Sequence, residues 1–485
     1  MKISRRPLSN NLWRLKTLVL EIKNKERLKA RLKRRAKNII HDPSRILVLS
    51  FLGIILLGAF LLSLPISAEN KNVSFIDALF TSTSAVCVTG LATIDVGREF
   101  NLFGEIVLLS LIQIGGLGIM TLSIIFMMMA GKRLSLTEKD VIQDTYTHGG
   151  QRSPATIAKE VLQFTLIIEG IGAALLACRF VPEQGLVKGV YSAVFHSVSA
   201  FCNAGFALFS NSLENYKTDW IVSLTISSLI ILGGIGFLVL AEIWRRLPYT
   251  RERIRRLSLH TKLVFVTTAI LIIFGTVSIA FLEWENTLAE LAPCHKILCA
   301  YFQSVSTRTA GFNTIPIGGM TGVSLLICIL LMFIGACPGS CAGGVKTTTA
   351  ATLTLLAISK LRGHEYTKIF CRTIPNQSIT RAINVVLISM TLVGASVMLL
   401  LISEFKGLSP SESQGGLMTI LFETVSAFGT VGLSMGITSK LTVLGKLIIS
   451  GVMFIGRLGP LMIAIAISRK SQAAFFYAEE NIMIG

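Results

Sequence analysis

The stretch Phe302-Gln303-Ser304-Val305-Ser306-Thr307-Arg308-Thr309-Ala310-Gly311-Phe312 is one of four copies of a single pattern in this 485-residue chain. In each copy a Phe is followed four residues later by Ser, and nine or ten residues later by a Gly that precedes Leu or Phe. The other copies run from Phe80 to Leu91, from Phe195 to Phe206 and from Phe422 to Leu433. The glycines are 115, 106 and 121 residues apart. Four copies of one glycine turn, each in a large module, predict four similar walls around a single axis.

The composition indicates that most of the chain lies in a lipid bilayer. Hydrophobic residues make up 52% and charged residues only 15% of the sequence, and the mean hydropathy is +0.67. These values exclude a water-soluble globule of ordinary composition. A helix needs roughly 20 apolar residues to cross the hydrocarbon core of a bilayer, which is about 30 Å thick. Eight stretches meet this requirement, in pairs: 45–66 and 101–130, 157–180 and 218–243, 261–283 and 321–358, and 382–404 and 441–468.

Between the members of each pair lies a shorter, weakly apolar segment that ends in one of the glycines: 73–91, 188–206, 295–312 and 416–433. Irregular backbone at membrane depth occurs only where it is buried in protein or lines a water-filled cavity. We therefore expect each segment to be a half-crossing pore helix followed by an extended return loop. The predicted fold is an all-α polytopic membrane protein of four helix–pore-loop–helix repeats, with eight transmembrane helices and four re-entrant loops in a pseudo-fourfold arrangement around one pore.

The positive charge of the chain is distributed unevenly along it. The net charge is +19, the first 45 residues hold 15 Lys or Arg, and the connections at 131–156, 244–262 and 359–381 are also basic. A basic chain can bind nucleic acid, but this alternation follows the positive-inside rule, which places both termini in the cytoplasm and the protein in the plasma membrane. We expect the basic tail to contact anionic lipid headgroups, and we expect no nucleic-acid partner. The expected divisions are a basic cytoplasmic tail at 1–44, repeats at 45–130, 131–260 (with its preceding cytoplasmic loop), 261–360 and 361–470, and a cytoplasmic tail at 471–485.

The glycine turns have the residues that a carbonyl-lined filter needs. A pore can replace the hydration shell of an ion with rings of backbone carbonyls, and glycine adopts conformations barred to residues with a Cβ. The predicted filter consists of Val88-Thr89-Gly90, Asn203-Ala204-Gly205, Thr309-Ala310-Gly311 and Thr430-Val431-Gly432. No charged residue stands in these triplets, so a cation would be selected by oxygens and not by a ring of carboxylates. The C-terminal ends of the pore helices would also present partial negative charge to it.

The second long helix of each repeat carries another repeated pattern: Ile114 to Gly118, Leu232 to Gly236, Ile334 to Pro338 and Ile455 to Gly459. Small residues let helices approach closely in lipid, and that packing role accounts for most of these glycines. Arg457 differs, because Gly116, Gly234 and Ala336 fill its column in the other repeats. It is either half of a structural ion pair, with Glu423 as one partner, or a fixed charge beneath the filter that lowers cation occupancy. We favour the second interpretation.

The third repeat departs from the others at residues 335–349. This stretch is rich in Gly, Ser and Pro, which do not propagate a rigid helix. A broken helix beside a permeation path can form a gate, although a local kink for packing is the alternative. The residues that we expect to form the gate, together with Arg457, are Gly335, Gly339, Ser340, Gly343, Gly344 and Lys346.

These features together resemble the Trk/Ktr/HKT superfamily of potassium transporters. The resemblance rests on the four filter glycines, the run from Ser306 to Asn313, Arg457 and the Gly-rich break ending in Gly-Gly-Val-Lys-Thr-Thr-Thr, and it spans about 45–485. It is strongest to the KtrB-type membrane subunits of bacterial Ktr systems, because the additional N-terminal helix pair typical of TrkH is missing.

The resemblance implies a homodimer with one pore per subunit and potassium (K⁺) uptake, often stimulated by sodium (Na⁺). It also implies control by a cytosolic RCK-type nucleotide-binding subunit (KtrA-like). In this family 335–349 would be the intramembrane gating loop, with Arg457 beside it, and K⁺ would bind at the filter glycines. Glycine in all four filter columns fits the potassium-preferring members. A sodium-preferring or poorly selective cation channel of the same fold is the alternative.

A membrane enzyme is the rival from another class. His196 and Cys202 in the second loop are its best candidate residues. Their counterparts in the other repeats provide no acid or base partner at the spacing that a nucleophile needs. We therefore expect no enzymatic activity and no organic cofactor.

Overall fold

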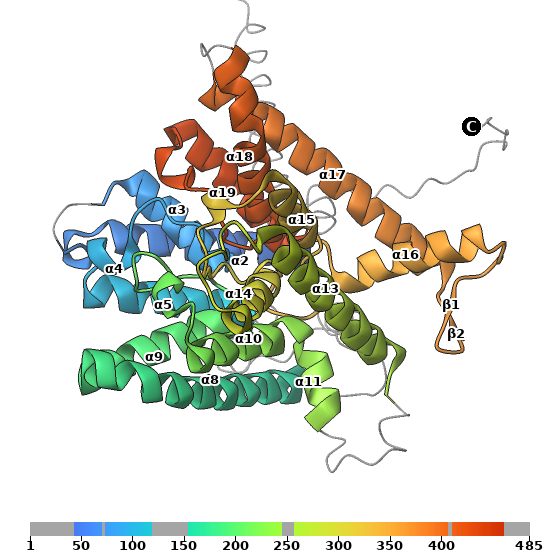
Figure 1. The fold of residues 1–485 in the computed structure, drawn as a ribbon, viewed down its shortest axis with the longest axis horizontal. Helices are drawn as coiled ribbons and strands as arrows, with labels where there is room; N and C mark the ends of the chain where they lie inside the picture. Colours follow the sequence, from blue (N-terminus) through green and yellow to red (C-terminus); the bar gives the residue numbers. More distant parts are fainter. Residues whose placement is uncertain (1–42, 70–72, 119–153, 245–256, 406–409, 460–485) are drawn as a thin grey trace, which may run out of the picture.

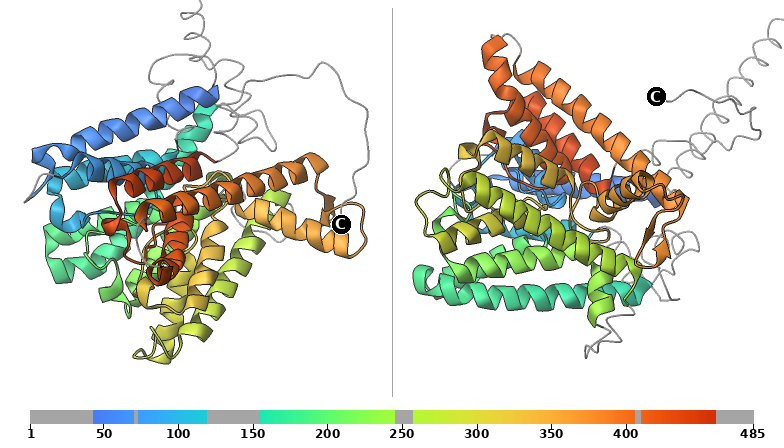
Figure 2. Two further views of the ribbon diagram at one scale, coloured as in Figure 1. Left: turned by 90° about the horizontal axis from the view of Figure 1, so that it is seen from above. Right: turned by 45° about the vertical axis from the view of Figure 1, so that its right-hand side comes forward.

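The computed structural model describes residues 43–69, 73–118, 154–244, 257–405 and 410–459. The predicted basic tail up to 42, the ends of two predicted spans at 119–130 and 460–468, and the C-terminal tail at 471–485 lie outside these ranges. The described part is predominantly helical, as predicted. Its one sheet has two strands, β1 (Lys368–Ile369) and β2 (Arg372–Thr373), which pair in antiparallel fashion. This hairpin and the helix before it, α16 (Thr347–Leu361), project from the rest of the bundle (Figures 1 and 2).

Three kinds of helix recur along the chain, and we call each set of three a unit. The first helices are α2 (Pro43–Ser63), α8 (Pro154–Gln184), α13 (Leu259–Glu283) and α17 (Asn376–Glu404). The pore-segment helices are α3 (Phe75–Val86), α9 (Leu186–Phe201), α14 (Pro293–Ser306) and α18 (Pro410–Gly429). The second helices are α5 (Leu102–Leu117), α10 (Trp220–Ile235), α15 (Gly322–Phe333) and α19 (Val443–Leu458). Short α4 (Val96–Glu99) and α11 (Phe237–Trp244) and the 3-10 turns Pro65–Ser67, Glu214–Tyr216, Ile317–Gly319 and Thr438–Lys440 complete the set.

Three of the described helices are long and apolar enough to cross a membrane: Lys159–Gln184, Leu259–Glu283 and Asn376–Glu404. Large apolar side chains on them face outward, including Ile273 at 63% and Met398 at 69% exposure, as expected where lipid is the solvent. A fourth span exists only if α10 and α11 count as one, but they are bent by 98° at a break. The stretch 218–243, predicted as a span, therefore consists of two helices joined at a sharp bend. Gly236 ends α10 with φ +101°, and the N–H of Phe237 bonds to the Gly339 carbonyl at 3.0 Å instead of continuing the helix.

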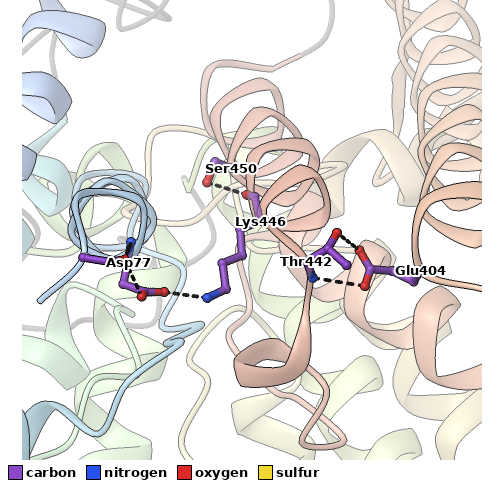
Figure 3. Close-up of polar contacts among 6 residues, drawn as sticks. Asp77, Glu404, Thr442, Lys446 and Ser450 are labelled. Atoms are coloured by element: carbon purple, nitrogen blue, oxygen red, sulfur yellow. Dashed lines mark hydrogen bonds and ion pairs between the residues drawn. The ribbon is translucent and has the colours of Figure 1, made fainter.

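Each second helix begins at a side chain that caps it. Asn101, Asp219, Thr321 and Thr442 accept hydrogen bonds from the first backbone N–H groups of α5, α10, α15 and α19, which would otherwise have no partner. In units three and four a Glu at the end of the first helix holds this cap. Glu404 accepts from the N–H (3.1 Å) and hydroxyl (2.6 Å) of Thr442, as Figure 3 shows, and Glu283 accepts from those of Thr321 at 2.8 and 2.9 Å. In these two units the end of the first helix is thus joined to the beginning of the second helix.

The first helix of each unit also contacts the pore-segment helix. Ser82, Ser197 and Ser304, two residues after the motif Phe, donate to the carbonyls of Ile55 (2.7 Å), Glu169 (2.6 Å) and Ile272 (2.8 Å). A glycine one turn further along each first helix allows this approach, because a Cβ there would collide with the serine hydroxyl: Gly58, Gly172 and Gly275. Unit four has Thr424 instead, whose hydroxyl bonds to Ile420 in its own helix at 2.7 Å. Three units therefore repeat the contact, and the fourth does not.

Contacts between units close a ring. The second helix of each unit packs against the pore-segment helix of the next: α5 on α9, α10 on α14, α15 on α18 and α19 on α3. The last contact, which joins the end of the chain to its beginning, includes an ion pair between Lys446 Nζ and Asp77 Oδ1 at 2.7 Å (Figure 3). The four motif Phe side chains are buried, none more than 1% exposed. The four glycine turns consequently lie at the centre of the ring.

Candidate functional site

The four glycine turns share one unusual backbone conformation. All four glycines have positive φ, from +70° at Gly205 to +95° at Gly90 and Gly432. The residue two positions earlier also has positive φ in every loop: Val88 (56°), Asn203 (59°), Thr309 (71°) and Thr430 (51°). The residue between them does not. Alternating handedness turns successive carbonyls to the same side of the chain, which is the arrangement that a carbonyl-lined ion path requires.

The four turns contact one another in a closed circle. A Cβ added to Gly90 would strike the Ala204 carbonyl, and one on Gly205 would strike the Ala310 carbonyl. In the same way Gly311 faces the Val431 carbonyl and Gly432 faces the Thr89 carbonyl. Each glycine thus meets the carbonyl of the residue before the glycine in the next unit. The four triplets predicted for the filter are thus brought together, and the carbonyls of Thr89, Ala204, Ala310 and Val431 each face a glycine of a neighbouring triplet.

The motif serine braces each turn, a role that the sequence analysis missed. In units one and four its hydroxyl accepts from the filter glycine, Gly90 N–H to Ser84 at 3.0 Å and Gly432 N–H to Ser426 at 3.1 Å. In units two and three it donates to the carbonyl just after the glycine, Ser199 to Phe206 at 2.7 Å and Ser306 to Phe312. All four serines are fully buried. Their presence in every copy of the motif was the available signal.

A cavity of about 380 Å³ opens on one side of the glycine ring. All four filter glycines line it, together with residues of the strands that leave each turn, among them Asp95, Asn313, Ser434 and Thr438. An ion that reaches the glycine ring from this cavity meets backbone oxygens and hydroxyls. Asp95 is the only carboxylate in the lining. The arrangement can replace the water around a cation without binding it to a fixed charge.

The glycines of the second-helix pattern have the packing role that was predicted for most of them. A Cβ on Gly115, Gly233 or Gly456 would collide with a carbonyl at the end of the pore-segment helix of its own unit: Val86, Phe201 and Phe428. The last glycine of the pattern has another role. Gly118, Gly236 and Gly459 have φ values of +75°, +101° and +85°, and α5, α10 and α19 end just before them. Three second helices therefore end at the same position of the pattern, and unit three, whose α15 ends at Phe333, is not alone in breaking there.

The break in unit three is an extended loop between α15 and α16 that lies against the other units. Its backbone N–H groups bond to unit two, Cys337 to the Gly234 carbonyl at 3.1 Å and Cys341 to the Gly233 carbonyl at 3.3 Å. They bond to unit four through Gly344, which donates to the Gly456 carbonyl at 3.3 Å. Gly343 N–H donates to the hydroxyl of filter residue Thr430 at 3.0 Å. The loop thus contacts the filter directly, on the side where the second helices end.

Two cations hold this loop. Lys346 Nζ donates to the loop carbonyls of Ala342 at 2.6 Å and Gly343 at 3.4 Å. Arg457 spans three units, because one guanidinium nitrogen donates to the Cys341 carbonyl in the loop and another to the Gly115 carbonyl at the end of α5. Of the other predicted gate residues, Ser340 donates to the Cys337 carbonyl at 2.6 Å, and Gly335 packs against Gly343. Gly339 and Gly344 have φ values of +70° and +67°.

The alternative role considered for Arg457, an ion pair with Glu423, is wrong. Among the described residues the Glu423 carboxylate accepts from the hydroxyls of Thr438 and, at 2.8 Å, Ser434, on the cavity side of the filter. Arg457 is bound to carbonyls at the opposite side. The filter therefore lies between them.

His196 and Cys202, the candidate residues for an enzyme, each contact other partners in the structure. His196 Nδ1 lies 2.7 Å from the Ser192 carbonyl, and Nε2 accepts from Leu208 N–H at 3.4 Å. The Cys202 thiol lies 3.7 Å from Gln113 Oε1 and 3.8 Å from Glu169 Oε1. In the described part of the chain neither side chain hydrogen-bonds to the other, so the pair does not form a nucleophile with its base. Within the same residues no group of three or more His, Cys, Asp or Glu could hold a metal ion.

Comparisons with known proteins agree with this geometry. A model of the family described as "TrkH: Cation transport protein" matches residues 15–477. The chain is 40% identical to the Ktr system potassium uptake protein B of Vibrio alginolyticus over 91% of its own length and 94% of that protein. It is 40% identical to the protein of that name from Bacillus subtilis (91% and 97%) and 36% identical to the potassium/sodium uptake protein NtpJ of Enterococcus hirae (92% and 97%).

A solved structure has the same fold. The potassium transporter TrkH from Vibrio parahaemolyticus superposes with a TM-score of 0.71, covering 88% of this chain and 85% of that one, at 18% identity. The family match and the identity to full-length relatives complete what the glycine ring indicates: this chain belongs to the TrkH family of cation transport proteins.

Proposed function

We propose that this protein takes up potassium across the plasma membrane through a selectivity filter formed by its four glycine turns. The observation that carries the proposal is the closed circle in which each filter glycine meets a carbonyl of the next unit. Rings of carbonyls select potassium by replacing its hydration shell. The names of the relatives from Vibrio alginolyticus and Bacillus subtilis support potassium as the ion.

The architecture that we propose is the predicted one: eight transmembrane helices and four re-entrant loops in pseudo-fourfold arrangement around one pore, with both termini in the cytoplasm. The packing of each second helix on the next pore-segment helix supports it. The 380 Å³ cavity would then be the outer mouth of the pore. The loop between α15 and α16 would lie on the cytoplasmic side of the filter.

We further propose that this loop is the gate and that Arg457 holds it closed. Its bonds to Cys341 and Gly115 join the loop to two other units, and Gly343 joins it to the filter residue Thr430. A ligand that moved the loop would break these bonds together. A cytosolic RCK-type nucleotide-binding subunit would supply that force, since two relatives are components of Ktr systems. A homodimeric state, stimulation by sodium and contact of the basic tail with lipid belong to the same proposal.

A sodium-preferring channel is the second candidate, and one observation favours it. NtpJ, at 36% identity over 92% of the chain, has both potassium and sodium in its name. Glycine at all four filter positions favours potassium.

Ion uptake by cells that lack their own potassium uptake systems tests the proposed function. The chain is expressed with and without a regulatory subunit, and uptake of potassium and rubidium is measured with and without sodium. We expect the chain to restore growth at low potassium and to take up both ions, faster with the partner present. Sodium uptake that potassium does not inhibit would support the second candidate. Absence of any cation uptake by protein that reaches the membrane would contradict both.

A further inference from the structure

One polar column lies directly behind the filter. The residue after each motif Phe is Thr81, His196, Gln303 or Glu423, and all four side chains are fully buried. Buried polar groups are usually hydrogen-bonded, so each needs a partner. Within the described part of the chain only two of the four have a hydrogen-bond partner. These two belong to units that face each other across the ring.

Glu423 holds the segment 433–438 that follows the filter glycine of unit four. We call the corresponding segment of each unit its exit strand, although it is not a β-strand. Its carboxylate accepts from the hydroxyls of Thr438 and, at 2.8 Å, Ser434, and these two hydroxyls lie 3.0 Å apart. Ser434 stands two residues after Gly432 and also accepts from Gly436 N–H at 3.0 Å. Ser434 and Thr438 both line the cavity above the glycine ring. A buried carboxyl group that accepts from two hydroxyls fixes this exit strand to the pore-segment helix.

His196 does the same in unit two. Nε2 accepts from the N–H of Leu208, three residues after Gly205, at 3.4 Å, while Nδ1 bonds to the Ser192 carbonyl of its own helix at 2.7 Å. The ring stacks on Phe209, with centroids 4.6 Å apart. The imidazole therefore bridges the pore-segment helix to the exit strand of its filter.

Units one and three have no such brace. Thr81 Oγ1 and both amide atoms of Gln303 have no hydrogen-bond partner among the described residues. Since the units follow one another around the ring, units two and four face each other across its axis, as do units one and three. Within the described residues, the side chain of this column thus bonds to the exit strand of its filter on one diagonal and not on the other.

We propose that Glu423 and His196 are positioning residues that set the spacing of two opposite filter loops, so that ion selectivity depends on these two members of the column and not on Thr81 or Gln303. The inference rests on the proposed function, since it concerns the same filter. The cation touches neither side chain; both act through the exit strands. A potassium filter discriminates against sodium only while its oxygens keep their positions, and a released strand would let the loop follow the smaller ion.

A matched pair of substitutions tests the inference. Glu423→Leu and Gln303→Leu remove polar atoms of similar size from the same column at the same burial. We expect Glu423→Leu to lower the ratio of potassium to sodium uptake by about tenfold, the effect of losing two buried hydrogen bonds, and Gln303→Leu to keep the ratio of the wild type. Glu423→Gln, which keeps an acceptor oxygen, should restore part of the ratio. His196→Leu should lower it, and Thr81→Val should not.

The partner residues separate a brace from a general packing effect. Thr438→Val should reproduce part of the loss, and the double variant Glu423→Leu with Thr438→Val should be no worse than Glu423→Leu alone. If Glu423→Leu does not accumulate in the membrane, Thr438→Val and Ser434→Ala decide the question. An unchanged ratio in those two variants, or an equal loss in Gln303→Leu, overturns the inference. If the variants still take up potassium, either of these results contradicts the inference but not the proposed function. Absence of potassium uptake by the wild type would contradict the proposed function itself.

Discussion

At the scale of single residues the filter combines strain and bracing. Val88, Asn203, Thr309 and Thr430 have positive φ without being glycine, which costs about 1–3 kcal/mol each and is least tolerated by a β-branched residue such as Val88. The hydrogen bonds of the four motif serines hold this conformation. The sequence pointed to the glycines because only they lack a Cβ. It could not show the strain two positions earlier, because nothing in Val or Thr indicates a left-handed backbone.

Replacing Ser84 by Ala tests this bracing. The substitution leaves the Gly90 N–H, now at 3.0 Å from the hydroxyl, without its acceptor, at a cost of about 1–3 kcal/mol for a buried group. We expect the turn to relax and the potassium-to-sodium uptake ratio to fall by about tenfold. Ser110→Ala is the control, because within the described residues that exposed hydroxyl bonds only to Ile106 of its own helix. Equal ratios in the two variants would show that Ser84 does not brace the filter.

At the scale of elements, the second helices and the loop of unit three form one layer beneath the filter. Composition was sufficient to predict an irregular segment at 335–349, and the structure has it between Phe333 and Thr347. The ends of α5, α10 and α19 before Gly118, Gly236 and Gly459 were not predicted. Close packing between helices already accounts for a glycine in an apolar helix. The sequence therefore did not distinguish the glycines that end a helix from those that only pack.

Two substitutions of Arg457 distinguish the effect of its hydrogen bonds from the effect of its charge. Arg457→Ala removes the bonds to Cys341 and Gly115, each worth about 1.5–3 kcal/mol for a charged donor, and we expect potassium uptake to rise by at least about tenfold. Arg457→Lys keeps the charge, but an ammonium has no planar fork to bridge two carbonyls. If bridging closes the gate, Lys should resemble Ala in uptake rate. If it resembles Arg, the fixed charge is what matters.

At the scale of the whole molecule, the fold is a ring closed between its last and first units. The repeat in the sequence predicted four similar modules, because a pattern that recurs every hundred residues or so reflects a recurring structure. Which surfaces join them could not be predicted, since Asp77 and Lys446 lie 369 residues apart and only one of the four joints has this pair. Similarly, the serine contact between first and pore-segment helices is absent from unit four alone.

Reversing the pair at this joint tests ring closure. The Asp77 and Lys446 side chains are only 19% and 15% exposed, so Asp77→Asn should lower the stability of the detergent-solubilised protein by about 1–3 kcal/mol, seen as a lower midpoint of thermal unfolding. Asp77→Lys alone should lower it more, by placing two cations together. The double variant Asp77→Lys with Lys446→Asp should recover part of the loss. No recovery would mean that the two side chains act independently.

The most direct test of the account is the ratio of potassium to sodium uptake in Gly90→Ser, Gly205→Ser, Gly311→Ser and Gly432→Ser. Each substitution puts a Cβ against the carbonyl of the next unit and at a φ of +70° or more. Gly170→Ser is the control, since a Cβ there has nothing within 4 Å. We predict that all four filter variants reach the membrane, lose potassium affinity and lower the ratio, while the control keeps both. Unchanged potassium affinity in the four variants would contradict a filter built from these glycines.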